Sequence, residues 1–268
     1  MKKKKAVKKI IKPSQPTDLE YIKMFDDCVI DATYLGSIDK TIDDQVSANK
    51  SKYTDISNLV KGGVGTLGVS PAFGNFNTAF TANSRPLEFK LPSSLFFTEA
   101  NKNPFQFKNP FDNGFGDFLI GGSQIPWYFI ACAHYLECSF SFKKHLHNGD
   151  PLTNYTVRVP ANRPKVGHPP PFTFEESAVD ALKLMKFDQI TNWNLPTVLR
   201  KLEAYNGFGY FKYHSINSPY LWSYSNQYTK GKYIADGKFD AEAVSKQMGA
   251  AVILKRMEER TLISIPRH

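Results

Sequence analysis

Residues 125–152 read IPWYFIACAHYLECSFSFKKHLHNGDPL, and this stretch decides how the rest of the chain is interpreted. Pro126 suits the beginning of a helix, because its missing N–H costs nothing in the first turn. The run from Trp127 to Leu136 contains no Asp, Glu, Lys or Arg and predicts a helix that is apolar on nearly every side. Such a helix belongs in a protein core, so we expect the chain to fold around it.

Glu137 follows directly, at the C-terminal end of this predicted helix. The helix dipole disfavours a negative charge there and apolar neighbours disfavour ionisation, so both effects raise the pKa of the carboxyl group. A carboxyl group with a raised pKa can donate a proton near neutral pH. The competing interpretation is that the helix reaches the surface at Glu137, which is then an ordinary solvated acid.

Two motifs in this sequence resemble those of the lysozyme superfamily. Glu137-Cys138-Ser139-Phe140 is similar to the family's Glu-Ser-x-Phe corner, with Cys138 in place of the usual serine. In that family, the glutamate at the end of a buried helix is the general acid that cleaves peptidoglycan glycan strands. Residues 202–210, LEAYNGFGY, resemble the Ala-Tyr-Asn-x-Gly motif of lytic transglycosylases and goose-type lysozymes. Two motifs in the family's order are more specific than either alone.

Further stretches resemble lysozyme-family proteins of bacteria and phages: HLHNGDPL at 145–152, SPYLWS at 218–223 and YTKGKYIADG at 228–237. The resemblance covers about Pro126 to Met257, with a weaker match over Leu19 to Tyr53. It implies an α+β, mainly α fold, with a lysozyme-like helical core and a small β-hairpin after the catalytic helix. It also implies that Tyr205 and Asn206 line the cleft opposite Glu137.

Glycoside cleavage needs a proton donor for the bridging oxygen and, usually, a second carboxyl group. We expect Glu137 to be the donor and Asp150 to be the second catalytic residue, which activates water. An aspartate in an Asn-Gly-Asp-Pro turn is also an ordinary turn former, and this alternative stays open. Tyr220 or Trp222 is expected to stack on glycan, since such rings suit sugar faces. The residues predicted to bind substrate are Tyr205, Asn206, His147, Thr153, Tyr220 and Trp222.

The two histidines at 145 and 147 are further candidates for positioning water or sugar. No third ligand follows them at a convincing spacing, so we predict no metal site and no cofactor.

Size and charge bound the class of protein. With 268 residues, of which 41% are hydrophobic, the chain is long enough to bury a full core. Its formal net charge of +9 indicates an anionic partner, with nucleic acid, a membrane surface and the bacterial cell wall as the candidates. Its basic residues are scattered beyond the N-terminus, which makes nucleic acid the weakest of these. No run of about 18 apolar residues occurs, so we predict no stable membrane insertion.

The cysteines and the N-terminal residues indicate the compartment in which the protein folds. Cys28, Cys132 and Cys138 are odd in number, and the last two are expected on different helix faces, which indicates folding in a reducing cytosol. Residues 1–16, MKKKKAVKKIIKPSQP, are predicted to be a basic disordered tail, because lysines interrupt any apolar run too often for a secretory signal. We therefore expect a protein made in the cytoplasm that reaches the cell wall through phage lysis, a virion or another export route.

Residues 17–268 are predicted to form one lysozyme-like catalytic domain, interrupted by an insertion over 58–123. The insertion is rich in Gly and Phe and lacks helical periodicity. It is interpreted either as a wall over a sugar cleft or as a local mini-core. Helices are predicted over 18–29, 37–53, 173–186, 195–205 and 240–260, and a short strand over 155–160. The first helix is expected to begin at Thr17 or Asp18 as cap, and the third at a capping box formed by Thr173 and Glu176. The core stripe predicted for the last helix is Ala243, Val244, Met248, Ala251, Val252 and Leu254.

The resemblance to the lysozyme superfamily implies an endolysin-like muramidase that hydrolyses the β-1,4 bond between MurNAc and GlcNAc in peptidoglycan, and we expect it to be a monomer. Two alternatives stay open. A lytic transglycosylase would leave 1,6-anhydro-MurNAc ends, because the substrate's own hydroxyl attacks in place of water. A non-catalytic lysozyme-like protein would bind peptidoglycan or serve structurally, although it would have no need of the acid at Glu137.

Overall fold

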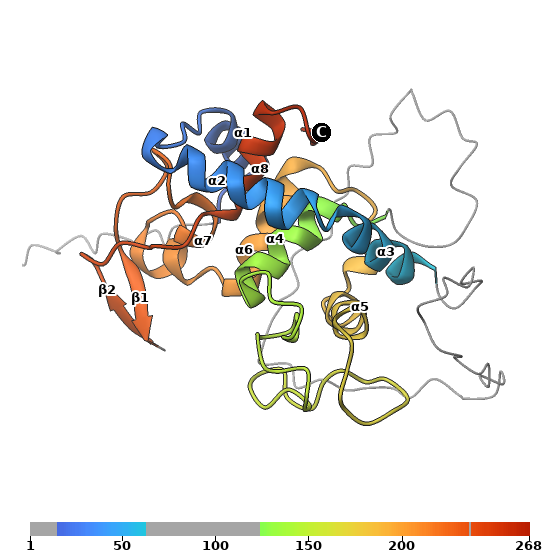
Figure 1. Ribbon diagram of the computed structural model, residues 1–268. Helices are drawn as coiled ribbons and strands as arrows, with labels where there is room; N and C mark the ends of the chain where they lie inside the picture. Colours follow the sequence, from blue (N-terminus) through green and yellow to red (C-terminus); the bar gives the residue numbers. More distant parts are fainter. Residues whose placement is uncertain (1–14, 63–123, 236) are drawn as a thin grey trace, which may run out of the picture. The chain divides into compact units, whose positions relative to one another are not determined.

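The computed structural model describes residues 15–62, 124–235 and 237–268, all of which belong to one compact unit of the chain. These residues are mainly helical and include one two-stranded antiparallel sheet, so the predicted mainly α fold class is confirmed (Figure 1). Most of the basic tail over 1–16 and of the insertion over 58–123 lies outside the described residues. No helix within the described ranges is both long and apolar enough to cross a lipid bilayer.

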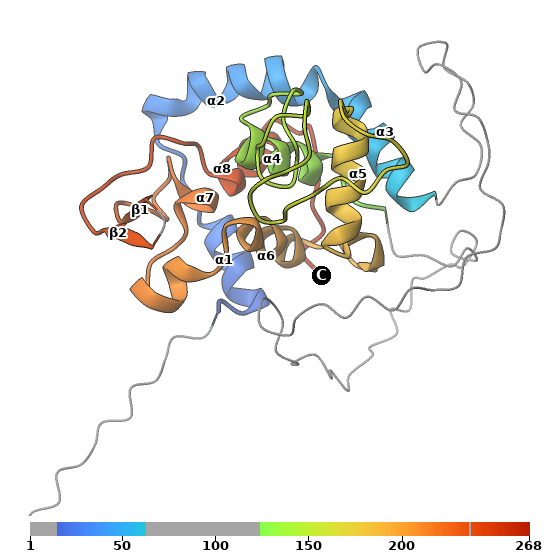
Figure 2. The ribbon, with the colours of Figure 1, turned by 90° about the horizontal axis from the view of Figure 1, so that it is seen from below.

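Helix α4 (Trp127–Cys138) lies at the centre of the helices (Figures 1 and 2). It contacts α3 (Lys50–Lys61), α6 (Leu195–Asn206) and α8 (Ala250–Glu259). Its buried residues are Tyr128, Phe129, Ile130, Ala131, Cys132, Ala133, His134, Leu136 and Cys138. Because these residues occupy nearly every side of the helix, the prediction of a core helix is confirmed.

Helix α1 (Asp18–Asp26) begins at the predicted cap. The Thr17 hydroxyl accepts a hydrogen bond from the Glu20 N–H at 3.3 Å, and the Glu20 carboxylate accepts one from the Thr17 N–H at 2.7 Å. This reciprocal capping box satisfies N–H groups that the first helical turn leaves without partners. The helix buries Tyr21 and Phe25 against the core.

The second predicted helix, over 37–53, is divided in the structure. A 3₁₀ turn η1 (Ala32–Tyr34) leads into α2 (Leu35–Thr41), a π-helical turn η2 (Ile42–Ser47) and then α3. Helix α3 continues past the predicted insertion boundary at residue 58. It does so because Ile56, Ser57 and Val60 are buried and keep one face of the helix against the core.

Two later helices begin as predicted. In α5 (Phe174–Leu184), Thr173 and Glu176 form the capping box, with bonds of 2.8 and 3.2 Å. In α6, the Asn194 side chain accepts a hydrogen bond from the Thr197 N–H at 3.1 Å. Pro196 lies in the first turn, where no intrahelical N–H donor is needed.

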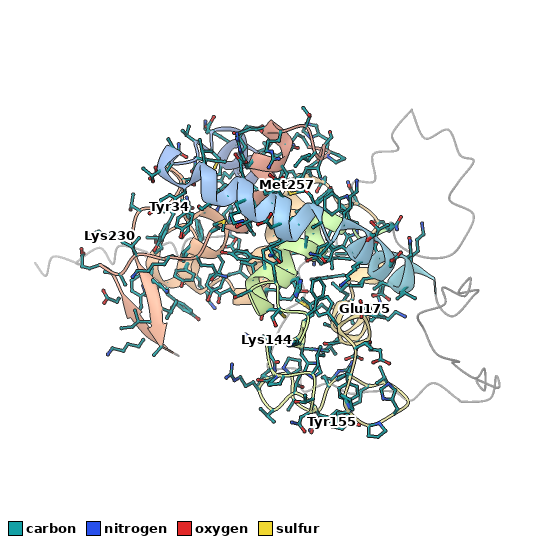
Figure 3. The ribbon with its side chains drawn as sticks, viewed as in Figure 1. Tyr34, Lys144, Tyr155, Glu175, Lys230 and Met257 are labelled. Atoms are coloured by element: carbon teal, nitrogen blue, oxygen red, sulfur yellow. The ribbon has the colours of Figure 1, made fainter. Side chains whose placement is uncertain are left out.

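The β-hairpin lies elsewhere than predicted. Strands β1 (Lys232–Ala235) and β2 (Lys238–Asp240) form it, close to the C-terminus. The predicted strand over 155–160 is wrong: the segment between α4 and α5 is irregular, with Tyr155 near its outer end (Figure 3). The N–H groups of Val157 and Arg158 donate to the Asp150 side chain instead of to a neighbouring strand.

The last predicted helix, over 240–260, is too long. Helix α8 begins only at Ala250, because Asp240 pairs with Lys232 in the sheet. Gly249 packs so closely on α7 (Pro219–Trp222) that a Cβ would lie 2.1 Å from the Leu221 carbonyl oxygen. Val244, predicted in the core stripe, has 57% of its surface exposed, whereas the α8 residues predicted there are buried: Ala251, Val252 and Leu254.

The remaining short elements are the 3₁₀ turn η3 (Phe187–Gln189) and the π-helical turn η4 (Tyr210–His214). The three cysteines are all buried and unpaired, so Cys132 and Cys138 do not bridge, as predicted.

Candidate active site at the end of the buried helix

Glu137 is the last residue but one of α4, where the chain turns sharply. The helix is capped by Ser139 at φ 50°, and Phe140 at φ 61° continues the left-handed corner. The Glu137 side chain is partly exposed, yet its carboxyl group forms no hydrogen bond or ion pair with any other described residue. Protein atoms surround much of this group, and its burial raises the pKa to about 8. At neutral pH, Glu137 is therefore mostly a protonated acid.

Two tyrosines lie within electrostatic range of this acid. Tyr205, in the last turn of α6, has a buried hydroxyl group with no hydrogen-bond partner among the described residues. Burial and then the charge of Glu137 raise the pKa of Tyr205, and the same two causes raise the pKa of Tyr220 on α7. The structure thus brings Tyr205 and Tyr220 to Glu137, from elements more than 60 residues further along the chain.

Two other predicted binding residues, Asn206 and Thr153, have side chains that form no hydrogen bond within the described residues. Asn206 ends α6 and is partly buried, and its side-chain amide forms no hydrogen bond within the described part of the chain. The exposed Thr153 side chain likewise has no hydrogen-bond partner among described residues. The Asn206 amide and the Thr153 hydroxyl can therefore form hydrogen bonds with a ligand.

The turn at 148–150 packs directly against the end of α4. Gly149 has φ +75°, and a Cβ there would lie 2.7 Å from the backbone carbonyl oxygen of Glu137. Only glycine fits both the conformation and the contact. The Asp150 carbonyl oxygen accepts a hydrogen bond from the His145 N–H at 2.7 Å, which closes the turn. The loop that carries Asp150 is thereby fixed beside the acid.

The Asp150 carboxylate binds groups further along its own loop. One carboxylate oxygen accepts hydrogen bonds from the N–H groups of Val157 at 2.9 Å and Arg158 at 3.1 Å. The Arg158 guanidinium lies 3.6 Å from the other oxygen. Burial raises the pKa of Asp150, but these interactions outweigh it and hold the pKa below its usual range. These bonds give the Asp150 carboxylate a structural role in organising its loop.

The two histidines face helix α5 instead of a cleft. His145 bonds through Nδ1 to the Ser177 hydroxyl at 2.9 Å and through Nε2 to the Asn154 carbonyl oxygen at 2.8 Å. The His147 Nε2 atom lies 2.8 Å from the Asp180 carboxylate, and only 1% of the His147 side chain is exposed. The prediction that His147 binds substrate is therefore corrected: its ring ties the loop to α5.

Trp222 also differs from its predicted role. It is 1% exposed and belongs to the hydrophobic core, so its ring is not available to stack on a sugar. Tyr220, two residues earlier, is partly buried and is the aromatic residue of α7 that lies near Glu137.

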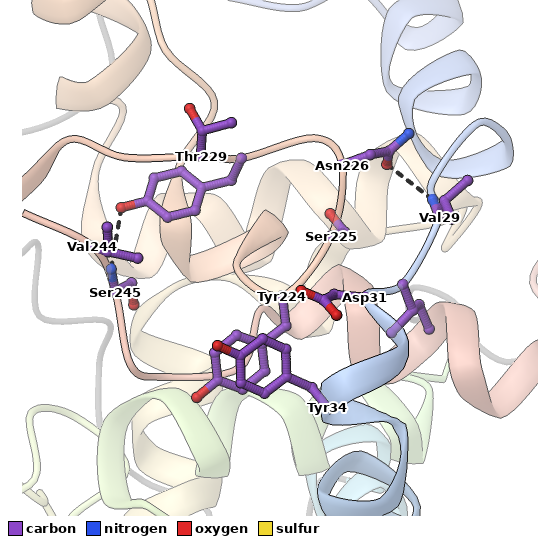
Figure 4. Close-up of a pocket in the computed structure, with 11 residues that line it drawn as sticks. Val29, Asp31, Tyr34, Tyr224, Ser225, Asn226, Thr229, Val244 and Ser245 are labelled. Carbon is purple, nitrogen blue, oxygen red and sulfur yellow. Dashed lines mark hydrogen bonds between the residues drawn. The ribbon is translucent and has the colours of Figure 1, made fainter.

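A cavity of about 390 Å³ lies apart from all predicted site residues (Figure 4). Its lining residues are Val29, Ile30, Asp31, Tyr34, Tyr224, Ser225, Asn226, Tyr228, Thr229, Val244 and Ser245. Glu137 does not line this cavity. The candidate active site is therefore defined by the Glu137 carboxyl group and the two tyrosines near it. No local sequence signal joins residues 29–34 to residues 224–245, which are almost 200 positions apart.

No protein-family model matches the chain, and no curated protein or solved structure matches it at a significant level. The resemblance to the lysozyme superfamily stays a prediction from the motif residues around Glu137 and Tyr205.

Proposed function

We propose that this protein cleaves β-1,4 glycosidic bonds in peptidoglycan glycan strands, with Glu137 as the general acid. The observation that carries the proposal is the unpaired, partly buried carboxyl group of Glu137, whose pKa burial raises to about 8. An ordinary surface glutamate would be ionised at neutral pH and unable to donate a proton. The motif resemblance supplies the substrate class, because it concerns this glutamate and the Tyr205 region together.

In the proposed reaction, the Glu137 carboxyl group protonates the bridging oxygen while the bond from that oxygen to the anomeric carbon breaks. Hydrolysis is then completed by water, which adds to the anomeric carbon and gives its proton to a carboxylate. Asp150 is the proposed acceptor, because its carboxylate is ionised and its turn packs on the Glu137 backbone. Tyr205, Asn206, Thr153 and Tyr220 are the proposed sugar contacts.

One observation favours the second candidate, a lytic transglycosylase. The Asp150 carboxylate already accepts two backbone hydrogen bonds and faces an arginine, which leaves it less free to activate water. In a transglycosylase the substrate's own 6-hydroxyl attacks the anomeric carbon, and Glu137 alone can give and then take the proton. No second carboxylate is then needed.

Mass spectrometry of fragments released from purified peptidoglycan tests both candidates. The wild type is compared with Glu137→Gln, which preserves size but cannot donate a proton, and with Asp150→Asn. Reducing muramic ends that require both Glu137 and Asp150 support the muramidase. Anhydro-muramic ends that require only Glu137 support the transglycosylase. If the wild type releases no fragments but still binds sacculi, the enzymatic proposal is wrong and a binding or structural protein is the better account.

A further inference from the structure

The walls of the cavity beside Asp31 are joined by backbone pairing. Ile30 and Ser225 form an isolated antiparallel bridge. The Asp31 N–H donates to the Tyr224 carbonyl oxygen at 3.0 Å, and the Val29 N–H donates to the Asn226 side chain at 2.9 Å. Figure 4 shows these two segments side by side, joined by the bond from Val29 to Asn226, with Val244 and Ser245 at another part of the lining. The cavity is thus a preformed feature, and its volume lies within the range of roughly 300–1,000 Å³ typical of small-molecule sites.

An aromatic pair forms one side of this cavity. The rings of Tyr34 and Tyr224 stack with centroids 3.7 Å apart and an interplanar angle of 5°. Tyr224 adopts φ 73°, a conformation that is unfavourable for a residue with a large side chain. Its stacking on Tyr34 and its hydroxyl bond to the Lys246 carbonyl oxygen at 2.5 Å hold it there. Such conformations persist where surrounding contacts impose them, and they are enriched at binding sites.

The cavity lining carries a negative charge and, among the described residues, no positive one. Asp31 is the only charged residue among the described residues that line it. One carboxylate oxygen of Asp31 accepts hydrogen bonds from the Thr33 N–H at 2.9 Å and the Thr33 hydroxyl at 2.8 Å, and these bonds hold the pKa of Asp31 below its usual value. The other oxygen has no partner among the described residues. A fixed negative charge with one free acceptor therefore lies at the cavity.

The other polar groups of the lining are largely used within the protein. The Tyr228 hydroxyl donates to the Gly231 carbonyl oxygen and accepts from the Ser245 N–H. Ser225 and Ser245 each donate to a backbone carbonyl oxygen and accept from a backbone N–H. A sugar ring, which needs several hydrogen-bond partners, is poorly served by such a lining. The Asn226 side chain is also used, whereas Thr229 and the Tyr34 hydroxyl form no hydrogen bond with described residues. Val29, Ile30 and Val244 add apolar surface.

We propose that this cavity binds a primary ammonium group carried on an apolar stem, such as the side chain of lysine or another diamino acid in a peptide. The free oxygen of Asp31 accepts a hydrogen bond from the ammonium group, and the exposed Tyr34 ring offers it a cation–π contact. The valine and isoleucine side chains cover the methylene stem. If the protein acts on peptidoglycan, the peptides attached to the glycan are the source of this ligand, and that further step rests on the proposed function.

Isothermal titration calorimetry of the full chain with a short lysine peptide and its Nε-acetylated counterpart tests the proposal. Neither peptide contains a glycosidic bond, so the result is independent of the proposed cleavage reaction, which is measured separately on sacculi. We expect the free amine to bind and acetylation or Asp31→Asn to weaken binding by about tenfold or more. Asparagine can still accept the Thr33 N–H bond, which preserves the cap.

Asp27→Asn is the matched control, because Asp27 is an exposed aspartate of the same segment that pairs with Lys23 and does not line the cavity. It is expected to bind the lysine peptide as the wild type does. A Tyr34→Ala variant should also weaken binding. Failure of the wild type to bind the free amine, equal binding of the two peptides, or equal effects of Asp31→Asn and Asp27→Asn would each overturn the proposal.

Discussion

Replacing Glu137 by glutamine should stabilise the protein at alkaline pH. The folded state holds the pKa of Glu137 at about 8, against 4.5 for an ordinary glutamate, because burial penalises the charged form. Below pH 4.5 the carboxyl group is protonated in both states and contributes nothing to the pH dependence. As the pH rises from 4.5 to 8, the unfolded chain ionises while the folded protein does not, so the native state loses stability.

The size of this effect follows from the two pKa values. Their separation corresponds to a cost of about 4 to 5 kcal/mol once the pH exceeds 8. Solvent reaches part of the side chain, which lowers our expectation to about 2 to 4 kcal/mol. Glutamine has no charge to bury, so Glu137→Gln should show little of this loss.

Urea denaturation of the wild type and Glu137→Gln at pH 5 and pH 8.5 measures the difference. We expect similar unfolding free energies at pH 5 and a more stable variant at pH 8.5. Asp150→Asn is the control without pH dependence in this window, because the stability that the lowered pKa of Asp150 gives is present above about pH 4 and is lost only as the pH falls further. A Glu137→Gln variant whose stability relative to the wild type does not change with pH would refute the reasoning.

Three further substitutions test the surroundings of the site. Gly149→Ala should lower the unfolding free energy by more than about 1 kcal/mol, measured by urea denaturation, because its Cβ would meet the Glu137 carbonyl oxygen. Trp222→Ala should cost about 3 to 5 kcal/mol by the same assay, whereas a solvent-exposed role would cost little. Tyr205→Phe should leave the thermal midpoint unchanged or raised, since the buried hydroxyl has no partner within the described residues, while the rate of sacculus cleavage falls.

Much of the helical core could be predicted because its signals are local. The uncharged run before Glu137 identified α4, and the Thr173–Glu176 box fixed the beginning of α5. The hairpin was missed although the dipeptide Asp236-Gly237 between two short β-prone runs is a hairpin signal. The predicted C-terminal helix was too long because apolar spacing alone does not reveal the close contact of Gly249 with Leu221.

The candidate site was predictable only in part. The two motifs predicted that Glu137 and Tyr205 lie near one another, and in the structure they are close enough for the charge of Glu137 to raise the pKa of Tyr205. The spacing of His145 and His147 could not show that both rings would bond to groups of the loop and helix α5. Burial of Trp222 and pairing of Asp31 with Tyr224 likewise depend on tertiary packing between distant segments. Such contacts between distant segments produce no local motif or hydrophobic periodicity, so they cannot be predicted from one sequence.

The most direct test of the account is the pKa of Glu137 in the folded protein. It can be measured by NMR from the side-chain carboxyl ¹³C shift during a pH titration, with Glu137→Gln used to assign the signal. The account predicts a midpoint near 8, the value that burial gives this carboxyl group. A midpoint close to 4.5 would show an ordinary solvated glutamate and would contradict its role as a proton donor.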